Sequence, residues 1–286
     1  MSAVCYNVLD IHSEQPELLQ LIESQLIVDD YYEDRVEKLF NFNNVIPMPL
    51  ELNDTNVPSG PTLVPYLYGF YSSNCTPYRS VLYSDGLPDT TTLAAIIFTG
   101  CNQPEHVETL VFLVDVLGVK LGDTIGDIRE YIKSYDRNTL TDDALIQYDR
   151  IRCDIDHWDR SLRMYEQHGT YNWYDWCDAN WNTPYLPTDT TIKIVDIPKP
   201  KLSITFDTEE ECPTPVIIRI SEQYGVTITG YSVDLSLRGG FTYVCNKGQL
   251  TSIEWSEELI HIYVYGNTAD WLPHHNEFLN QLLLEN

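Results

Sequence analysis

The alternation of apolar and polar side chains predicts that the chain begins with a strand followed by a helix. Residues 4–11 alternate loosely and are rich in β-branched side chains, which favours a strand. Pro16 then opens a stretch whose apolar side chains recur at helical spacing: Leu18, Leu19, Ile22 and Leu26. An acidic link at 29–34 separates this pair from an apolar run at 39–46 that ends in a Pro-rich turn.

The middle of the chain changes from irregular to strongly periodic. Residues 53–103 are rich in Pro, Thr, Ser and Tyr, with one predicted strand at 93–99. Two helices are predicted next, a buried one at 104–117 and an amphipathic one at 123–135. From 142 to 165 an apolar residue recurs every three or four positions, which predicts a long amphipathic helix. Its apolar residues are Leu145, Tyr148, Ile151, Ile155, Trp158, Leu162 and Tyr165.

The last third of the chain is mostly strand-like. Short β-branched runs predict strands at 191–197, 202–206, 226–235, 241–245, 249–255 and 259–265. A helix at 215–224 is stopped by Gly225, and a final helix is predicted near 275–284. This order indicates an α+β fold with a mainly antiparallel sheet and helices on one face. We assign residues 1–52 and 136–286 to the core, and 53–135 to an insertion of loops, short strands and helices.

Charge restricts the partners that the protein can have. The chain has 43 Asp and Glu against 17 Lys and Arg, a formal net charge of -26. A surface that reads phosphates needs clustered Lys and Arg, so we expect no direct binding of nucleic acid or of an anionic membrane. Hydrophobic residues make up 43% and aromatic residues 12%, which is typical of a folded protein rather than of an acidic disordered tail. A strongly acidic protein surface attracts the basic clefts of other proteins.

Cysteine usage and the N-terminus indicate an intracellular soluble protein. The seven cysteines are odd in number and include no C-x-x-C pair, so we expect reduced, mostly buried thiols. The first residues carry neither a basic region nor an apolar segment of the kind that marks secretion. No apolar run approaches the roughly 18 residues of a membrane span.

Three segments carry residues with catalytic or metal-binding chemistry. The run DIDHWD offers Asp154, Asp156, His157 and Asp159, as metal-dependent hydrolases require, although a solvated acidic helix face explains the same run. His274 and His275 could ligate zinc, but neighbouring side chains on a helix diverge by about 100°. A polar helix start is therefore the favoured interpretation. Cys177 could act as a nucleophile with His168, but a core thiol is the favoured interpretation. We therefore predict no cofactor, no metal and no enzymatic activity.

An aromatic block lies between the long helix and the strands. It comprises Tyr171, Trp173, Tyr174, Trp176 and Trp181. These rings could stack on bases, but their charged neighbours are acidic, which favours packing in the core or against a protein partner. Tyr and Trp are also the residues that binding hot spots favour, so Trp173 and Trp176 are candidate partner-binding residues.

Four blocks of sequence resemble a known family in their order along the chain. They are CYNVLDI at 5–11, FNFNNVIPMPLEL at 40–52, HGTYNWYDWCDANWNT at 168–183 and ITFDTEEECPTPVIIRISEQYGVTITG at 204–230. In this order they resemble the phage and plasmid YubB-like ferredoxin-like family of unknown function. The resemblance covers the start of the chain and most of residues 157–250, but not 53–135.

The resemblance implies a split β-α-β sheet of ferredoxin-like type and a mobile-element origin, and it supplies no catalytic residue. The chain departs from the family at two places. Where family members usually continue W-G-T-K-W-N, this chain has Trp181-Asn182-Thr183-Pro184-Tyr185. The aromatic residue after F-x-T is replaced by Glu209 and Glu210.

These observations leave three function hypotheses. The leading one is a phage-encoded acidic interaction protein that binds and inhibits a host defence nuclease or another nucleic-acid-binding complex in the host cytoplasm. Carboxylates at helical spacing would stand in for duplex phosphates. The candidate residues are Asp142, Asp149, Asp156 and Asp159, with Trp173 and Trp176 as hot spots. The alternatives are a metal-dependent hydrolase that uses DIDHWD, and a structural or maintenance protein of a mobile element. The sequence does not determine whether the protein forms a homo-oligomer.

Overall fold

A computed structural model describes residues 4–32, 35–53, 55, 67, 89–100, 104–195, 199–236 and 239–285. The chain divides into two compact units. Unit 1 comprises Met1–Pro49 and Tyr174–Asn286, and unit 2 comprises Leu50–Trp173. Each unit is treated separately below.

Unit 1 is built on a six-stranded antiparallel sheet with the strand order β4-β5-β1-β6-β7-β8. The strands are β1 (Val4–His12), β4 (Thr188–Val195), β5 (Lys201–Glu209), β6 (Thr227–Asp234), β7 (Gly240–Asn246) and β8 (Gln249–Glu254). Because β5 lies between β1 and β4, and β1 lies between β5 and β6, two split β-α-β units interleave. The helices of these units are α1 (Pro16–Leu26) and α8 (Thr214–Tyr224). The predicted α+β class with an antiparallel ferredoxin-like sheet is confirmed.

One face of this sheet is covered by α1 and α8, and its side chains alternate accordingly. Every second residue of β1 and β5 is buried, which follows from the two-residue period of a strand. Leu9 and Ile204 face each other in register and are fully buried. Asn7 is buried on the same face, where its amide bonds the hydroxyls of Thr208 and Ser232, each at 2.9 Å. The remaining side chains of β1 and β5 lie on the second face and are partly exposed.

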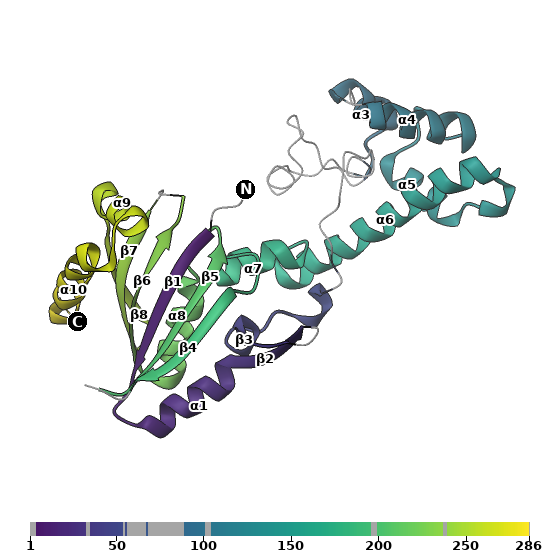
Figure 1. The fold of residues 1–286 in the computed structure, drawn as a ribbon. Helices are drawn as coiled ribbons and strands as arrows, with labels where there is room; N and C mark the ends of the chain where they lie inside the picture. The colour runs from purple at the N-terminus through teal and green to yellow at the C-terminus, as the bar shows by residue number, and fades with distance from the viewer. Residues whose placement is uncertain are drawn as a thin grey trace. The chain divides into compact units, whose positions relative to one another are not determined.

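Two C-terminal helices cover the far end of that second face. They are α9 (Glu257–Tyr265) and α10 (Thr268–Glu285), and α10 packs against β7 and β8 (Figure 1). His275 bonds the Thr242 hydroxyl at 3.1 Å, which ties α10 to β7. The strand predicted at 259–265 is therefore wrong. The Ser256 hydroxyl accepts the Leu259 backbone N–H and begins a helix there, and this local cap overrides the β-branched composition.

A buried aromatic cluster holds the two chain segments of unit 1 together. It combines Phe40 at the end of the hairpin β2 (Ile27–Tyr32) and β3 (Arg35–Phe40) with Phe42, Phe206 and Trp181. Trp181 is the last residue of α7 (Trp173–Trp181). The rings meet edge to face at centroid distances of 5.0 to 6.1 Å. The Trp181 indole N–H also donates to the Ile46 carbonyl at 2.9 Å.

Unit 2 is helical in the part that the structure describes. Its helices are α3 (Leu93–Gly100), α4 (Pro104–Val111), one π-helical turn (Phe112–Val116), α5 (Ile125–Ser134) and α6 (Asp142–His168). The strand predicted at 93–99 is wrong, because this apolar run forms α3. The loops and short strands predicted for residues 53–92 fall mostly outside the described residues. The apolar stripe of α6 packs with α5 and the π-helical turn around Phe112, Ile128, Ile155 and Trp158.

This packing moves the boundary of the insertion. The sequence places residues 136–173 with the core, whereas the structure places the whole of α6 in unit 2. The reason is that Tyr148, Ile151 and Ile155 share one hydrophobic cluster with α5, and no buried residue of unit 1 belongs to that cluster in the described part of the chain. The insertion therefore runs from Leu50 to Trp173.

We predict that Trp158→Ala destabilises unit 2 by about 3–5 kcal/mol, because it removes a large side chain that is only 4% exposed and leaves a cavity. Urea unfolding followed by circular dichroism measures this change. The matched control is Ile146→Ala on the same helix, where the side chain is 72% exposed and the expected change is within about 0.5 kcal/mol. Equal effects of the two substitutions would contradict the assignment of this stripe to the core.

Candidate functional site

The four predicted aspartates all lie on α6, in unit 2. The helix begins after Thr141 and ends at Gly169, whose φ of 74° suits glycine as a C-terminal cap. Asp142 lies in the first turn, where its negative charge interacts favourably with the positive end of the helix dipole. Asp149 and Asp156 follow at intervals of seven residues and therefore share its face. Asp159 lies one turn beyond Asp156.

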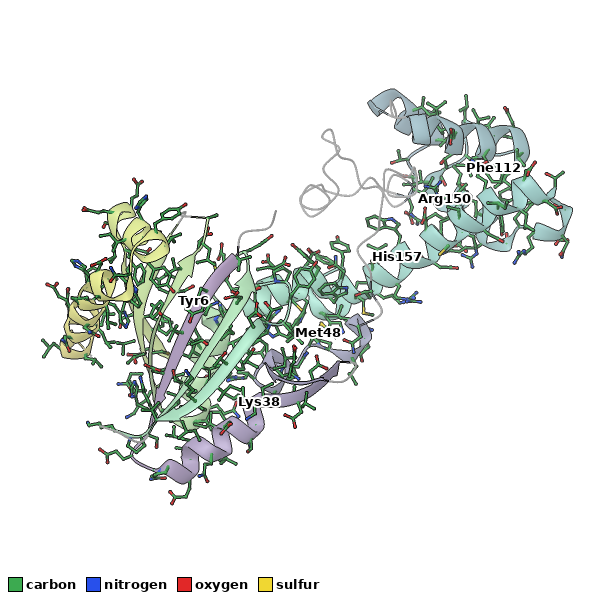
Figure 2. All side chains as sticks on the ribbon, viewed as in Figure 1. Tyr6, Lys38, Met48, Phe112, Arg150 and His157 are labelled. Atoms are coloured by element: carbon green, nitrogen blue, oxygen red, sulfur yellow. The ribbon has the colours of Figure 1, made fainter. Side chains whose placement is uncertain are left out.

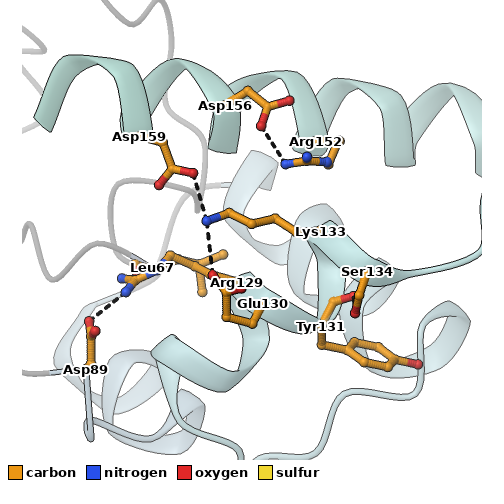
Figure 3. Close-up of polar contacts among 10 residues, drawn as sticks. All are labelled: Leu67, Asp89, Arg129, Glu130, Tyr131, Lys133, Ser134, Arg152, Asp156 and Asp159. Atoms are coloured by element: carbon orange, nitrogen blue, oxygen red, sulfur yellow. Dashed lines mark hydrogen bonds and ion pairs between the residues drawn. The ribbon is translucent and has the colours of Figure 1, made fainter. Parts of the chain in front are cut away.

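Three of these four carboxylates form ion pairs within unit 2. Asp149 pairs with Arg137 at 2.8 Å, Asp156 with Arg152 at 2.6 Å and Asp159 with Lys133 at 2.7 Å. Figure 3 shows the last two pairs: Asp159 of α6 reaches Lys133 of α5, and the pair of Asp156 with Arg152 lies along α6. A carboxylate beside its own cation projects a weaker field than an isolated one. The α6 face is therefore less like a row of phosphates than its spacing suggests.

The segments proposed for metal binding do not assemble a metal site in the described residues. No group of three or more His, Cys, Asp or Glu side chains is placed there to hold a metal ion. His274 is exposed and His275 is buried, so the two rings diverge as expected from their helical spacing. Burial lowers the pKa of His275, which keeps this imidazole neutral.

The aromatic block contributes more to the core than to the surface. Trp176 is 8% exposed and meets Trp181 edge to face at 5.7 Å. Trp173 is half-buried, and its backbone N–H donates to the Thr55 hydroxyl at 3.1 Å. The Cys177 thiol lies 3.7 Å from the Met48 sulfur, and burial raises its pKa to about 12. Of the two predicted hot spots, Trp176 is thus occupied by packing within unit 1.

A second acidic surface, which the sequence analysis did not single out, lies in unit 1. We call it the acidic edge: it consists of five carboxylates at the end of β5, in the turn before α8 and at the end of β6, namely Asp207, Glu209, Glu210, Glu211 and Asp234. Within the described ranges, no Lys or Arg forms an ion pair with any of them. Glu210 has the left-handed φ of 69°, which turns the chain sharply between β5 and α8.

In the part of the chain that the structure describes, the hydrogen bonds to the acidic edge come from neutral donors. The Asn182 amide donates to Glu211 at 2.8 Å, and the Tyr174 hydroxyl donates to Glu210 at 3.5 Å. These bonds fix the carboxylates without cancelling their charge. Glu209 and Glu210 are also the residues at which the chain departs from the YubB-like pattern, which is the one sequence signal that pointed here.

Neighbouring groups respond to the field of the acidic edge. The pKa of the Cys5 thiol is raised to about 12, mainly by burial and then by Asp234, Glu211 and Asp207. Burial, followed by the charge of Glu210, raises the pKa of Tyr174 to about 12. Burial is the larger cause of both shifts, and the negative charges of the edge raise the two pKa values further in the same direction. The carboxylates of the edge therefore act together on the same part of unit 1.

The excess charge is also larger in unit 1 as a whole. Its two segments contain 25 Asp and Glu against 8 Lys and Arg, whereas unit 2 contains 18 against 9. The excess negative charge of this mixed α+β protein is thus concentrated in its ferredoxin-like unit, which contains the acidic edge. Among the described residues, no helix combines the length and the apolar character needed to cross a membrane.

Comparisons with known proteins add little to this assignment. No family model and no curated protein matches the chain. Among solved structures, the chain is similar to the crystal structure of the protein api92 from Yersinia pseudotuberculosis, which carries the family description DUF1281. The identity is 12%, the alignment covers 90% of this chain and 99% of that one, and the TM-score is 0.37. So weak a likeness assigns no residue and no function, and the resemblance to the YubB-like family stays a prediction.

We predict that adding Mg²⁺, Mn²⁺ or Zn²⁺ leaves the thermal midpoint of the protein unchanged. A specific site would stabilise the folded state by mass action. The midpoint is measured by scanning fluorimetry over a range of metal concentrations. A saturable increase that Asp156→Ala abolishes would instead support the hydrolase hypothesis.

We also predict that Cys153 reacts with iodoacetamide before Cys177. Cys153 is exposed on α6, whereas Cys177 is buried with a pKa of about 12, so almost none of its reactive thiolate form is present at pH 8. Peptide mass spectrometry after timed labelling measures both sites in one sample. Equal labelling of the two thiols would show that α7 opens in solution.

Proposed function

We propose that this protein is an acidic interaction protein that binds the basic surface of a nucleic-acid-binding protein directly. The observation that carries the proposal is the acidic edge, where five carboxylates at one end of the sheet have no described cationic partner. Such charges attract a basic groove over roughly one Debye length, about 8 Å at physiological salt. The fixed carboxylates would occupy positions on the partner that otherwise hold phosphates.

The structure favours the acidic edge over α6 as the contact surface. On α6, three of the four aspartates already have a cation within 2.8 Å. A partner would have to compete with these internal pairs. At the acidic edge the hydrogen bonds that hold Glu210 and Glu211 come from a phenol and an amide, so the full charge is available.

The resemblance to a mobile-element family suggests which basic partner to test. For a phage-encoded protein it would be a host defence nuclease or another nucleic-acid-binding complex in the host cytoplasm, which the bound protein would inhibit. Electrostatic steering would give rapid capture. This mode of action needs neither a metal nor a cofactor.

The experiment first captures partners from host cells and then tests competition. A tagged form of the whole chain is used to isolate bound proteins, which are identified by mass spectrometry and purified. Labelled duplex DNA is then bound to the purified partner, and unlabelled chain is titrated in. We expect the DNA to be displaced. Simultaneous binding of DNA and chain would contradict the proposal.

We predict that a triple variant of the acidic edge slows association with the partner more than an equally charged variant of α6. The edge variant is Glu209→Gln, Glu210→Gln and Glu211→Gln, and the control is Asp149→Asn, Asp156→Asn and Asp159→Asn. We expect about ten-fold slower association for the edge variant at low salt, with dissociation changed less. Surface plasmon resonance at several salt concentrations measures both rates.

The control separates local charge from net charge, because each triple variant removes three carboxylates. A larger effect of the α6 variant would return the contact to the helix that the sequence indicated. Equal, small effects would show that the carboxylates serve only solubility. Thermal midpoints of both variants establish that the fold is intact.

A further inference from the structure

Three tyrosines form a partly exposed aromatic platform on the second face of the sheet in unit 1. Tyr6 comes from β1, Tyr231 from β6 and Tyr263 from α9. We call these residues the tyrosine platform. The Tyr6 ring centroid lies 6.3 Å from that of Tyr231 and 6.4 Å from that of Tyr263, and the latter two are 5.8 Å apart. Figure 2 shows Tyr6 on β1, at the side of the sheet nearer α9.

A carboxylate lies directly beside this platform. Asp207 of β5 is the register partner of Tyr6, so both side chains project from the same face. A second carboxylate, Asp189, approaches from β4, where the register shifts and Asp189 takes a left-handed φ of 49°. The pKa of Asp207 is raised by burial and then by the charge of Asp189. Asp207 is thus a carboxylate whose described neighbours include another negative charge and no ion-pairing cation.

We propose that the tyrosine platform and Asp207 bind an arginine side chain of the basic partner. The proposal rests on the proposed function and locates one contact within it. The guanidinium plane would lie on the partly exposed ring of Tyr6 while two of its N–H groups donate to the Asp207 carboxylate. The negative ring quadrupole and the carboxylate both attract this cation. Its charge would also relieve the repulsion between Asp207 and Asp189.

Arginine fits this site better than lysine or a nucleobase. Its guanidinium is planar, weakly hydrated and able to stack and to form two parallel hydrogen bonds, whereas an ammonium is a strongly hydrated point charge. A base could stack on the same rings, but its phosphates would face Asp189 and the acidic edge, to which Asp207 belongs. The ring contacts of Tyr231 with Trp255 and Trp271 explain why this ring is fixed. This packing does not explain why the Asp207 carboxylate lies beside the platform.

The test uses the whole chain and a defined probe. The probe is a fluorescein-labelled peptide in which arginine alternates with glycine, compared with matched peptides that carry lysine or the neutral isostere citrulline. Binding is measured by fluorescence anisotropy at low salt. We expect the arginine peptide to bind more tightly than the lysine peptide, and the citrulline peptide not to bind.

Four variants assign the binding to the platform. Tyr6→Leu removes the ring face and Asp207→Asn removes the charge, and each should weaken the arginine peptide by about five-fold. Tyr6→Phe keeps the ring and should bind within about two-fold of the unchanged chain. Asp142→Asn in unit 2 removes one charge elsewhere and should have no comparable effect. Circular dichroism checks each fold, and Asp207→Asn remains informative if Tyr6→Leu fails to fold.

Each outcome decides one of the two proposals. Unchanged peptide binding in both Tyr6→Leu and Asp207→Asn overturns the platform, whatever the variants of the acidic edge do. Equal affinity for arginine and lysine peptides overturns it as well, because only the charge would then matter. If both variants lose the peptide but capture the nucleic-acid-binding partner normally, the platform stands and its place in the proposed function is wrong.

Discussion

The structure of unit 1 depends on one constraint: two chain segments that are separated by the whole of unit 2 must come together in one core. The edge-to-face contacts of Trp181 with Phe42, and of Phe42 with Phe206, meet this constraint. Closing a chain around so long an insertion costs entropy, although this cost rises slowly with length. The buried rings and the bond from Trp181 to the Ile46 carbonyl offset it. The position of the acidic edge is given by the pairing of β1 with β5 and β6 in the sheet that this closure completes.

Ion pairs within the chain determine which of its carboxylates can attract a basic partner. Unit 2 carries its aspartates beside arginines and lysines, so much of its charge is balanced over a few ångströms. In unit 1 the sharp turn at Glu210 presents consecutive glutamates whose hydrogen-bond donors are neutral. Composition reports only the total charge. The distribution of counter-charges decides which carboxylates a basic partner meets first.

Much of the fold could be predicted from periodicity, and the errors have local physical causes. The stripe from Tyr148 to Trp158 predicted α6 because a long amphipathic pattern has one interpretation. The run at 259–265 misled because Ile and Tyr favour strands, whereas the deciding signal was the cap at Ser256. Apart from the departure at Glu209 and Glu210, the sequence did not indicate the acidic edge, because ion pairs such as Asp149 with Arg137 depend on the tertiary structure. Asp207 and Tyr6 are 201 residues apart in the chain and meet only through the β1–β5 register.

The two ends of the insertion meet within unit 1. Cys177 touches Met48, and Trp181 touches Ile46, so the chain leaves and re-enters this unit at neighbouring points. A segment inserted between adjoining points can change in length or composition without shifting the strands on either side. Unit 2 could therefore be shortened, lengthened or replaced while the sheet of unit 1 and the acidic edge stay in place.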